Sequence, residues 1–342
     1  MRIIGVGNAL IDLIVKIEED ILNEKLNLKK GGMYLIDSEK YKIISDILSK
    51  YEKFFKSGGS VANTMYGLGA LGIECAYVGK VGKNDFGKFF KEDMENKNVK
   101  CFLTYSEKIP TGQSIVLVTP DHERTFATYL GAAVELNCND VKEDWFKDFD
   151  LLHLEGYLIH NKDLFEHITK SAKKNNLKIS LDLSNFTVVE EYRDYLFNYI
   201  KDYVNILFAN EQEAESLIKN ESVKIIESFK DYCECIVLKM AEKGSMIYYK
   251  GHIHRQHAFK AKVVDTTGAG DWYAAGFLYG LSLNYPINKC ALIGTIFATK
   301  VIEVYGAKIP DNELELIKKN FLKNSLMLDN WLKSLEIDEN LL

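Results

Sequence analysis

Residues 265–271 read DTTGAGD, and the apolar segment WYAAGFLYGL follows directly at 272–281. Glycines at 268 and 270 let the backbone approach a ligand closely, and the segment after them favours a helix because it has no β-branched run. The first amides of such a helix lack intrahelical partners and lie at the positive end of its dipole, which suits an anion. Asp271 could take a proton from a hydroxyl while these amides stabilise a transferring phosphoryl group. The stretch therefore predicts a phosphate-handling loop, and the alternative is a glycine turn that only caps a helix.

A second glycine cluster lies nearer the N-terminus, where residues 57–63 read SGGSVAN. Two further elements are GVGNALID at 5–12 and FANEQEAE at 208–215, which contains an N-x-x-E pattern. In order and spacing, these elements and DTTGAGD resemble the ribokinase-like, or PfkB, family of carbohydrate and nucleoside kinases over almost the whole chain. GVGNALID is similar to the opening of the adenosine kinase branch.

Strand-like and helix-like segments alternate along the chain. Apolar strand-like runs occur at 2–7, 74–82, 151–159, 178–184, 205–211 and 235–241, with helical patterns such as 164–175 and 192–203 between them. This alternation predicts a mainly parallel sheet with helices on both faces. The resemblance implies the same α/β class in a ribokinase-like three-layer α/β/α fold, and we expect residues 1–342 to form a single domain of this kind.

Two segments interrupt the alternation. Residues 13–37 and 101–130 contain short β-prone runs, such as GGMYLID and TGQSIVLVT, with turn residues between them. The resemblance implies that they form a small β-sheet lid over the substrate. An exposed sheet can also pair subunits, so we expect a monomer or a homodimer through the lid. The alternative is a set of hairpins with no role at the site.

Composition and motifs exclude several classes of protein. The net charge is −6 and the pI is near 5.8, which argues against nucleic acid or a membrane as the main partner. The chain has no run of 18 apolar residues, and its first residues resemble a strand, so we expect a cytoplasmic protein. A Walker A sequence is absent, and GVG at 5–7 lacks the third glycine of a dinucleotide-binding fingerprint. The histidines at 252, 254 and 257 could ligate zinc, but a polar strand edge explains them more simply.

The resemblance assigns roles at the reacting end of the site. Asp271 is the expected base, and the amides of Gly268, Ala269 and Gly270 form the expected anion hole. Arg124 is similar to the basic residue that reaches from the lid toward the transferring phosphate. The alternative for Arg124 is a solvated surface position.

At the acceptor end, Asp12 is similar to the carboxylate that accepts hydrogen bonds from two neighbouring sugar hydroxyls. The alternative is a helix or turn cap. Tyr157 is a candidate for stacking on a base, or else a core residue. The other residues expected to line this pocket are Asn8, Gly58, Gly59 and Asn63.

At the nucleotide end, the resemblance places Asn210 and Glu213 near the triphosphate and its Mg²⁺, with Glu213 acting through water. Alternatively, the two residues only begin the following helix. Asp265 and Thr267 are similar to residues that hold a monovalent cation such as K⁺. ATP and Mg²⁺ are thus the expected cofactors, and K⁺ is a third candidate. Further nucleotide contacts are expected from Lys239, Gly244, Thr267, Gly268 and Gly270.

Two positions depart from the family pattern. Lys239 stands in LKMAEKGS, where the family has a Thr-x-Gly approach to the nucleotide, so it either adds a phosphate contact or lies along the surface. Trp272 follows Asp271 where a smaller residue or leucine is usual. Its bulk either presses on the acceptor pocket or packs into the core.

The sequence therefore predicts an ATP-dependent kinase that phosphorylates a primary hydroxyl. The favoured acceptor is the 5′-hydroxyl of adenosine or a related purine nucleoside. One alternative is a sugar kinase acting on ribose, fructose or 2-keto-3-deoxygluconate. A second is a catalytically silent metabolite-binding regulator, which would not need to keep the base and the anion-hole glycines.

Overall fold

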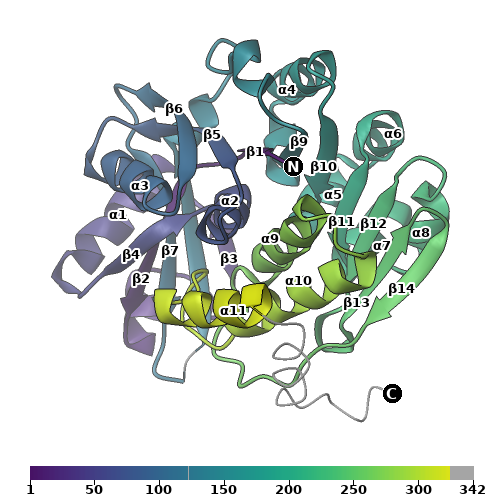
Figure 1. Ribbon diagram of the computed structural model, residues 1–342. Coiled ribbons are helices and arrows are strands. Elements are labelled where there is room, and N and C mark those ends of the chain that lie inside the picture. Colours follow the sequence, from purple (N-terminus) through teal and green to yellow (C-terminus); the bar gives the residue numbers. More distant parts are fainter. Residues whose placement is uncertain (122, 324–342) are drawn as a thin grey trace.

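The centre of the protein is a nine-stranded sheet (Figure 1). The computed structural model describes residues 1–121 and 123–323. The strands of this sheet are β1 (Ile3–Val6), β5 (Cys75–Gly82), β6 (Val99–Ser106), β9 (Leu151–Glu155), β10 (Lys178–Asp182), β11 (Ile206–Asn210), β12 (Cys235–Lys239), β13 (Ser245–Tyr249) and β14 (His252–Gln256). Their order is β14-β13-β12-β11-β10-β9-β1-β5-β6, parallel from β12 to β6 and antiparallel at the β13–β14 edge. The predicted α/β class is confirmed, and each predicted strand segment contains one of these strands.

Helices cover both faces of the large sheet. Alternate strand residues point to opposite sides, so that Ile3 belongs to one core cluster and Ile4 to the other. The first cluster is covered by α2 (Ser60–Ala70), α3 (Asp85–Glu95), α9 (Ala269–Ser282), α10 (Ile287–Val301) and α11 (Asp311–Lys323). The second is covered by α4 (Lys162–Lys174), α5 (Phe186–Glu191), α6 (Arg193–Tyr203), α7 (Glu211–Ile218) and α8 (Lys224–Phe229). Within the described residues, no helix combines the length and apolar character needed to cross a bilayer.

A second, five-stranded sheet lies beside the first. It contains β2 (Leu10–Lys16), β3 (Met33–Leu35), β4 (Phe54–Gly58), β7 (Thr111–Val118) and β8 (Arg124–Gly131), in the order β3-β8-β7-β2-β4. One face, with Leu13 and Ile115, packs against α1 (Ser38–Ile47) and the short helix η1 (Ile21–Lys25). Because the chain's own helices cover that face, a homodimer through this sheet would have to use its other face or its edges.

The bounds predicted for the small sheet need correction. Residues 101–106 belong to β6, which pairs with β5 in the large sheet, and not to the small sheet. The strand β4, which pairs with β2, lies outside both predicted segments. A β-prone composition cannot tell the two sheets apart, whereas the crossover from β5 through α3 carries the chain back to a parallel position beside β5.

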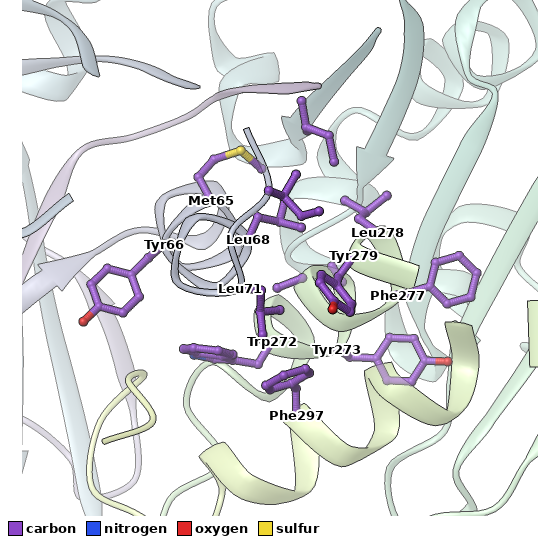
Figure 2. Close-up of a cluster of buried hydrophobic side chains, with 14 of the residues drawn as sticks. Met65, Tyr66, Leu68, Leu71, Trp272, Tyr273, Phe277, Leu278, Tyr279 and Phe297 are labelled. Carbon is purple, nitrogen blue, oxygen red and sulfur yellow. The ribbon is translucent and has the colours of Figure 1, made fainter. Parts of the chain in front are cut away.

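The helix α9 is buried on nearly all sides, between α2 and α10 (Figure 2). Trp272 has no exposed surface, and its ring centroid lies 5.8 Å from that of Phe297 and 6.4 Å from that of Tyr66. Its Nε1 donates a hydrogen bond to the Ala307 carbonyl oxygen at 2.8 Å. The bulk of Trp272 therefore packs into the core, and it fastens the start of α9 to the segment at 306–310.

Candidate active site

Asp271 lies in the first turn of α9 and faces the start of α2. Ser60 Oγ donates to Asp271 Oδ1 at 2.8 Å, and Asn63 Nδ2 donates to Oδ2 at 2.9 Å. Burial raises the pKa of Asp271 from 3.8 to about 6, although the bonds from Asn63 and Ser60 act in the opposite direction. The two glycine-rich segments thus meet at one carboxylate, which is enclosed and more basic than an ordinary aspartate.

The loop before α9 presents unpaired backbone amides. Gly268 is the N-cap residue, with φ 78°, and the amides of Gly268, Gly270 and Asp271 donate to no acceptor in residues 1–121 and 123–323. The Ala269 amide, predicted to join the anion hole, donates instead to the Thr266 carbonyl oxygen at 3.2 Å. The free amides lie at the positive end of the α9 dipole, as an anion site requires.

The glycines before α2 let other pocket residues come close. A Cβ on Gly58 would lie 2.4 Å from Asp12 Oδ1, so this position must lack a side chain. Gly59 has φ 103°, and its Cβ would lie 2.2 Å from the Asn8 carbonyl oxygen. Burial raises the pKa of Asp12 from 3.8 to about 6, against the lowering effect of Lys308. The structure therefore brings the predicted acceptor residues Asn8, Asp12, Gly58, Gly59 and Asn63 together near Asp271.

Glu155, which sequence reasoning missed, holds two of these segments in place. It ends β9 and is 1% exposed. Its Oε1 accepts hydrogen bonds from the backbone N and the Nδ2 of Asn8 at 2.9 and 2.8 Å, and its Oε2 accepts one from the Val61 amide at 3.1 Å. The signal available in the sequence was a charged residue at the carboxyl end of an apolar strand-like run.

A buried group of charges lies beside the anion loop. Lys239 Nζ pairs with Asp182 Oδ2 at 2.8 Å, and a Cβ on Gly270 would lie 3.1 Å from the same nitrogen. Although burial lowers the pKa of Lys239, Asp182 and Glu213 raise it overall, so the ammonium stays charged. Lys239 thus does not lie along the surface. Asp182, at the end of β10, is a second residue that sequence reasoning missed.

Asn210 and Glu213 form a capping box at the start of α7. The side chain of Asn210 accepts from the Glu213 amide at 2.9 Å, and Glu213 Oε2 accepts from the Asn210 amide at 2.8 Å. The pair therefore does begin a helix, which was the alternative interpretation. Burial also raises the pKa of Glu213 to about 7, with Lys239 lowering it and Asp182 raising it. Glu213 consequently belongs to the same charged group as Lys239 and Asp182.

Arg124 reaches from the small sheet to the loop before α9. It forms an ion pair with Asp265 and donates to the Val264 carbonyl oxygen at 2.7 Å. Asp265 also accepts from the Thr267 amide at 2.9 Å and from the Gly306 amide at 2.6 Å. Arg124 is thus not a solvated surface residue, and N–H donors surround the carboxylate of Asp265. In the part of the chain that the structure describes, no cluster of three His, Cys, Asp or Glu side chains could hold a metal ion.

Two residues that were predicted to contact a ligand, Tyr157 and Gly244, have structural roles in the fold. Tyr157, in the short helix η5 (Gly156–His160), packs against the second core cluster, and its hydroxyl donates to the Ser184 carbonyl oxygen at 3.5 Å. Gly244 has φ 90° and closes the turn from η6 (Ala241–Lys243) into β13. Their roles in stacking and nucleotide binding remain predictions.

Comparison with known proteins identifies the family of the chain. A family model described as "pfkB family carbohydrate kinase" matches residues 40–314. The chain belongs to the PfkB family. Like other PfkB proteins it is a kinase, and its predicted ribokinase-like architecture is confirmed by the structures of relatives.

Both nucleoside and sugar kinases occur among the relatives of this PfkB protein. The structure of a probable sugar kinase from Rhizobium etli CFN 42 superimposes with a TM-score of 0.84 at 31% identity, covering 94% of this chain and 98% of the other. Adenosine kinase from Sinorhizobium meliloti gives a TM-score of 0.83 at 31% identity, covering 93% and 98%. Adenosine kinase from Saccharomyces cerevisiae is 26% identical, covering 92% of this chain and 99% of its own.

The stability of this PfkB kinase should fall as the pH rises from 6.5 to 8. Burial raises the pKa of Glu155 from 4.5 to about 7, so up to about pH 7 the folded state holds a proton that the unfolded chain has lost. Because the folded state binds more protons there, raising the pH favours unfolding by at most about 1.4 kcal/mol per pH unit, and the effect levels off above the folded pKa. Burial lowers the pKa of His153 to about 4. Because the unfolded chain then binds more protons than the folded state only below the ordinary value of 6.5, His153 makes stability rise with pH only below 6.5.

Thermal unfolding at pH 6.5 and pH 8 measures this slope. Glu155→Gln should reduce the loss of Tm between the two values, leaving the part due to Glu213, whereas the exposed control Glu166→Gln should not alter it. An unchanged slope in Glu155→Gln would contradict the assignment.

Proposed function

We propose that the protein is an ATP-dependent kinase that transfers the γ-phosphoryl group to a primary hydroxyl, with the 5′-hydroxyl of adenosine or a related purine nucleoside as the favoured acceptor. One observation carries the proposal. The enclosed carboxylate of Asp271 lies between the unpaired amides of Gly268 and Gly270 and the residues around Asp12 and Asn63. A base, an anion site and hydroxyl acceptors are thus adjacent.

In this proposal Asp271 removes the proton from the acceptor hydroxyl as the hydroxyl oxygen attacks the γ-phosphorus, and the bond from that phosphorus to the bridging oxygen breaks to release ADP. A pKa of about 6 leaves the carboxylate mostly ionised at neutral pH, yet more basic than an ordinary aspartate. The amides of Gly268 and Gly270 would stabilise the negative charge on the transferring phosphoryl group. Asp12 and Asn63 would hold the neighbouring hydroxyls of the acceptor.

The charged group at Lys239 fits the nucleotide. Its ammonium lies against Gly270, which supports the proposal that it binds a phosphate oxygen at the anion loop. The carboxylate oxygens of Asp182 and Glu213 are ligands of the type that Mg²⁺ prefers, and they would hold the ion through water. When bound, the ion would neutralise phosphate charge. Asp265, which was expected to hold K⁺, accepts hydrogen bonds from two amides and pairs with Arg124, so its charge is already balanced within the chain. We therefore leave K⁺ out of the proposal.

The small sheet supports a nucleoside over a free sugar. Residues opposite one another across its strands share a face. On the face that carries Asp12, the register places Ser114 and Thr128 between Asp12 and Leu35, and it places Ile14, Val116 and Phe126 in the adjacent row of the same face. Leu35 is 72% exposed, so this face presents apolar surface three strands from the hydroxyl-binding carboxylate. A purine ring can cover such a surface, whereas ribose or fructose alone cannot. The adenosine kinases among the relatives support the same choice.

The test is ADP release from ATP and Mg²⁺ with adenosine, inosine, guanosine, ribose, fructose and 2-keto-3-deoxygluconate. Turnover restricted to nucleosides, with a product whose phosphorus couples to the 5′ protons, is the expected result. Turnover with a free sugar would support the sugar kinase alternative. Silence with all six, despite acceptor binding, would support the regulator alternative and contradict the role of Asp271.

A further inference from the structure

A buried lysine lies beside the acceptor residues. Lys308 is 4% exposed and follows α10 in the segment 306–310. Its Nζ lies 3.6 Å from the centroid of the Tyr66 ring, and no residue in the described part of the chain accepts a hydrogen bond from it. A buried ammonium without an acceptor destabilises a fold, and the aromatic ring compensates for this only in part. Stability alone therefore does not explain the choice of lysine.

The backbone around Lys308 is fixed to the start of α9. The Ala307 carbonyl oxygen accepts the hydrogen bond from Trp272 Nε1 at 2.8 Å. On the same side, a Cβ on Gly268 would lie 2.7 Å from the Ala307 Cβ. Lys308 thus keeps a defined position relative to the anion loop and Asp271.

Charged groups on four elements act electrostatically on Lys308, and its segment contacts the strand of Asp12, since a Cβ on Gly306 would lie 3.1 Å from Ile14 Cδ1 of β2. The charged groups are Asp93 of α3, Asp12 of β2, Lys56 of β4 and Asp271 of α9. Asp93 already accepts hydrogen bonds from the Ser57 amide at 3.2 Å and from its hydroxyl at 2.5 Å. Lys56 lies opposite Asp12 across the β2–β4 pair, on the same face.

Lys308 lowers the pKa of Asp12. Burial raises the pKa of Asp12, and Lys308 opposes that rise more than Lys56 does, while Asp271 and Asp265 add to it. Burial in turn lowers the pKa of Lys308 to about 8, which leaves the ammonium mostly charged at neutral pH. An ionised Asp12 can accept two hydrogen bonds from neighbouring hydroxyls, whereas its protonated form would have to donate one.

We propose that Lys308 is a positioning residue of the acceptor site, whose buried charge keeps Asp12 in the ionised form that binds the acceptor's hydroxyls. The inference rests on the acceptor-binding role proposed for Asp12. It requires only that the acceptor carry adjacent hydroxyls, so it holds for a nucleoside and for a sugar.

The experiment compares Lys308→Met with Lys308→Arg over pH 5.5 to 8. Loss of a facing opposite charge raises a carboxylate pKa by about one unit or more. In Lys308→Met we therefore expect the acid limb of kcat/KM for the acceptor to move up by about one pH unit, KM at pH 6.5 to rise about threefold, and kcat to change little. Lys308→Arg retains a permanent charge and should restore the limb.

Lys97→Met is the matched control. Lys97 Nζ lies 5.7 Å from the centroid of the same Tyr66 ring, but it pairs with the exposed Asp311 at 2.5 Å. Its removal should leave the acid limb and KM unchanged.

Three outcomes would overturn the inference. They are an unchanged acid limb and KM in Lys308→Met, failure of Lys308→Arg to restore them, or a lowered Tm with equal losses of activity at every pH. If no acceptor is turned over, the proposed function fails first, and the pH dependence of unfolding still tests Lys308. Lys308→Met should steepen the loss of stability between pH 6 and 8, and the double variant Asp12→Asn/Lys308→Met should not.

Discussion

Replacement of Asp271 by asparagine should lower kcat about a thousandfold, within the range of roughly 10² to 10⁴ that a positioned general base contributes. Asparagine has the same shape and can still accept from Ser60, and Asn63 Oδ1, which accepts no hydrogen bond from the described residues, can accept from the new amide. The fold should therefore survive, and KM for both substrates should change less than kcat. Steady-state ADP release in the presence of saturating ATP and acceptor measures the loss.

The control for this substitution is Asp144, an exposed residue in a surface ion pair. Asp144→Asn removes a carboxylate from a surface ion pair with Lys147 and should leave kcat unchanged. A kcat for Asp271→Asn within tenfold of the unmodified protein would contradict its role as the base.

Asp12→Asn should lower kcat/KM for the acceptor by a factor of about 10² to 10³, chiefly through KM. The carboxylate is proposed to accept two hydrogen bonds, and each hydrogen bond to a charged group contributes about 1.5 to 3 kcal/mol. Asparagine fits the same space beside Gly58 and removes the repulsion between two buried carboxylates, so stability should not fall. Initial rates over a wide range of acceptor concentration, with ATP saturating, separate KM from kcat.

The two substitutions are informative together. Asp271→Asn should act on kcat, and Asp12→Asn should act on KM, because one carboxylate is proposed to react and the other to bind. An unchanged acceptor KM in Asp12→Asn would show that Asp12 only stabilises the loop before Gly58.

The sequence predicts those parts of the site that depend on backbone geometry. DTTGAGD and SGGSVAN need glycine for close approaches, and the hydrogen bonds from Ser60 and Asn63 to Asp271 join the two stretches. Continuous apolar runs predict the buried parallel strands for a similar reason, since both faces of each strand are covered.

Other parts of the fold and of the site depend on contacts between distant segments, which no local sequence pattern predicts. The strand β6 has the same β-prone composition as the small sheet, and only its crossover from β5 assigns it to the large one. Glu155 and Asp182 leave a weak signal as acidic residues that end apolar runs. Lys308 leaves none, because the packing of α2 and α9 against a distant loop is what buries it.

The hydrogen bonds from Ser60 and Asn63 to Asp271 have a consequence for biosynthesis. They join residues 211 and 208 positions apart, and Trp272 ties the same site to a segment still further along the chain. Contacts of such separation close late in folding, and domains assemble as the ribosome releases them. The strands β1, β5, β6 and β9 can pair before Asp271, the partner of Asn63, and Lys308, the proposed partner of Asp12, have been synthesised. The pocket is therefore complete only after residue 308 has been translated. Phosphotransfer should therefore arise in one late step, which makes it a measure of completed chains during translation.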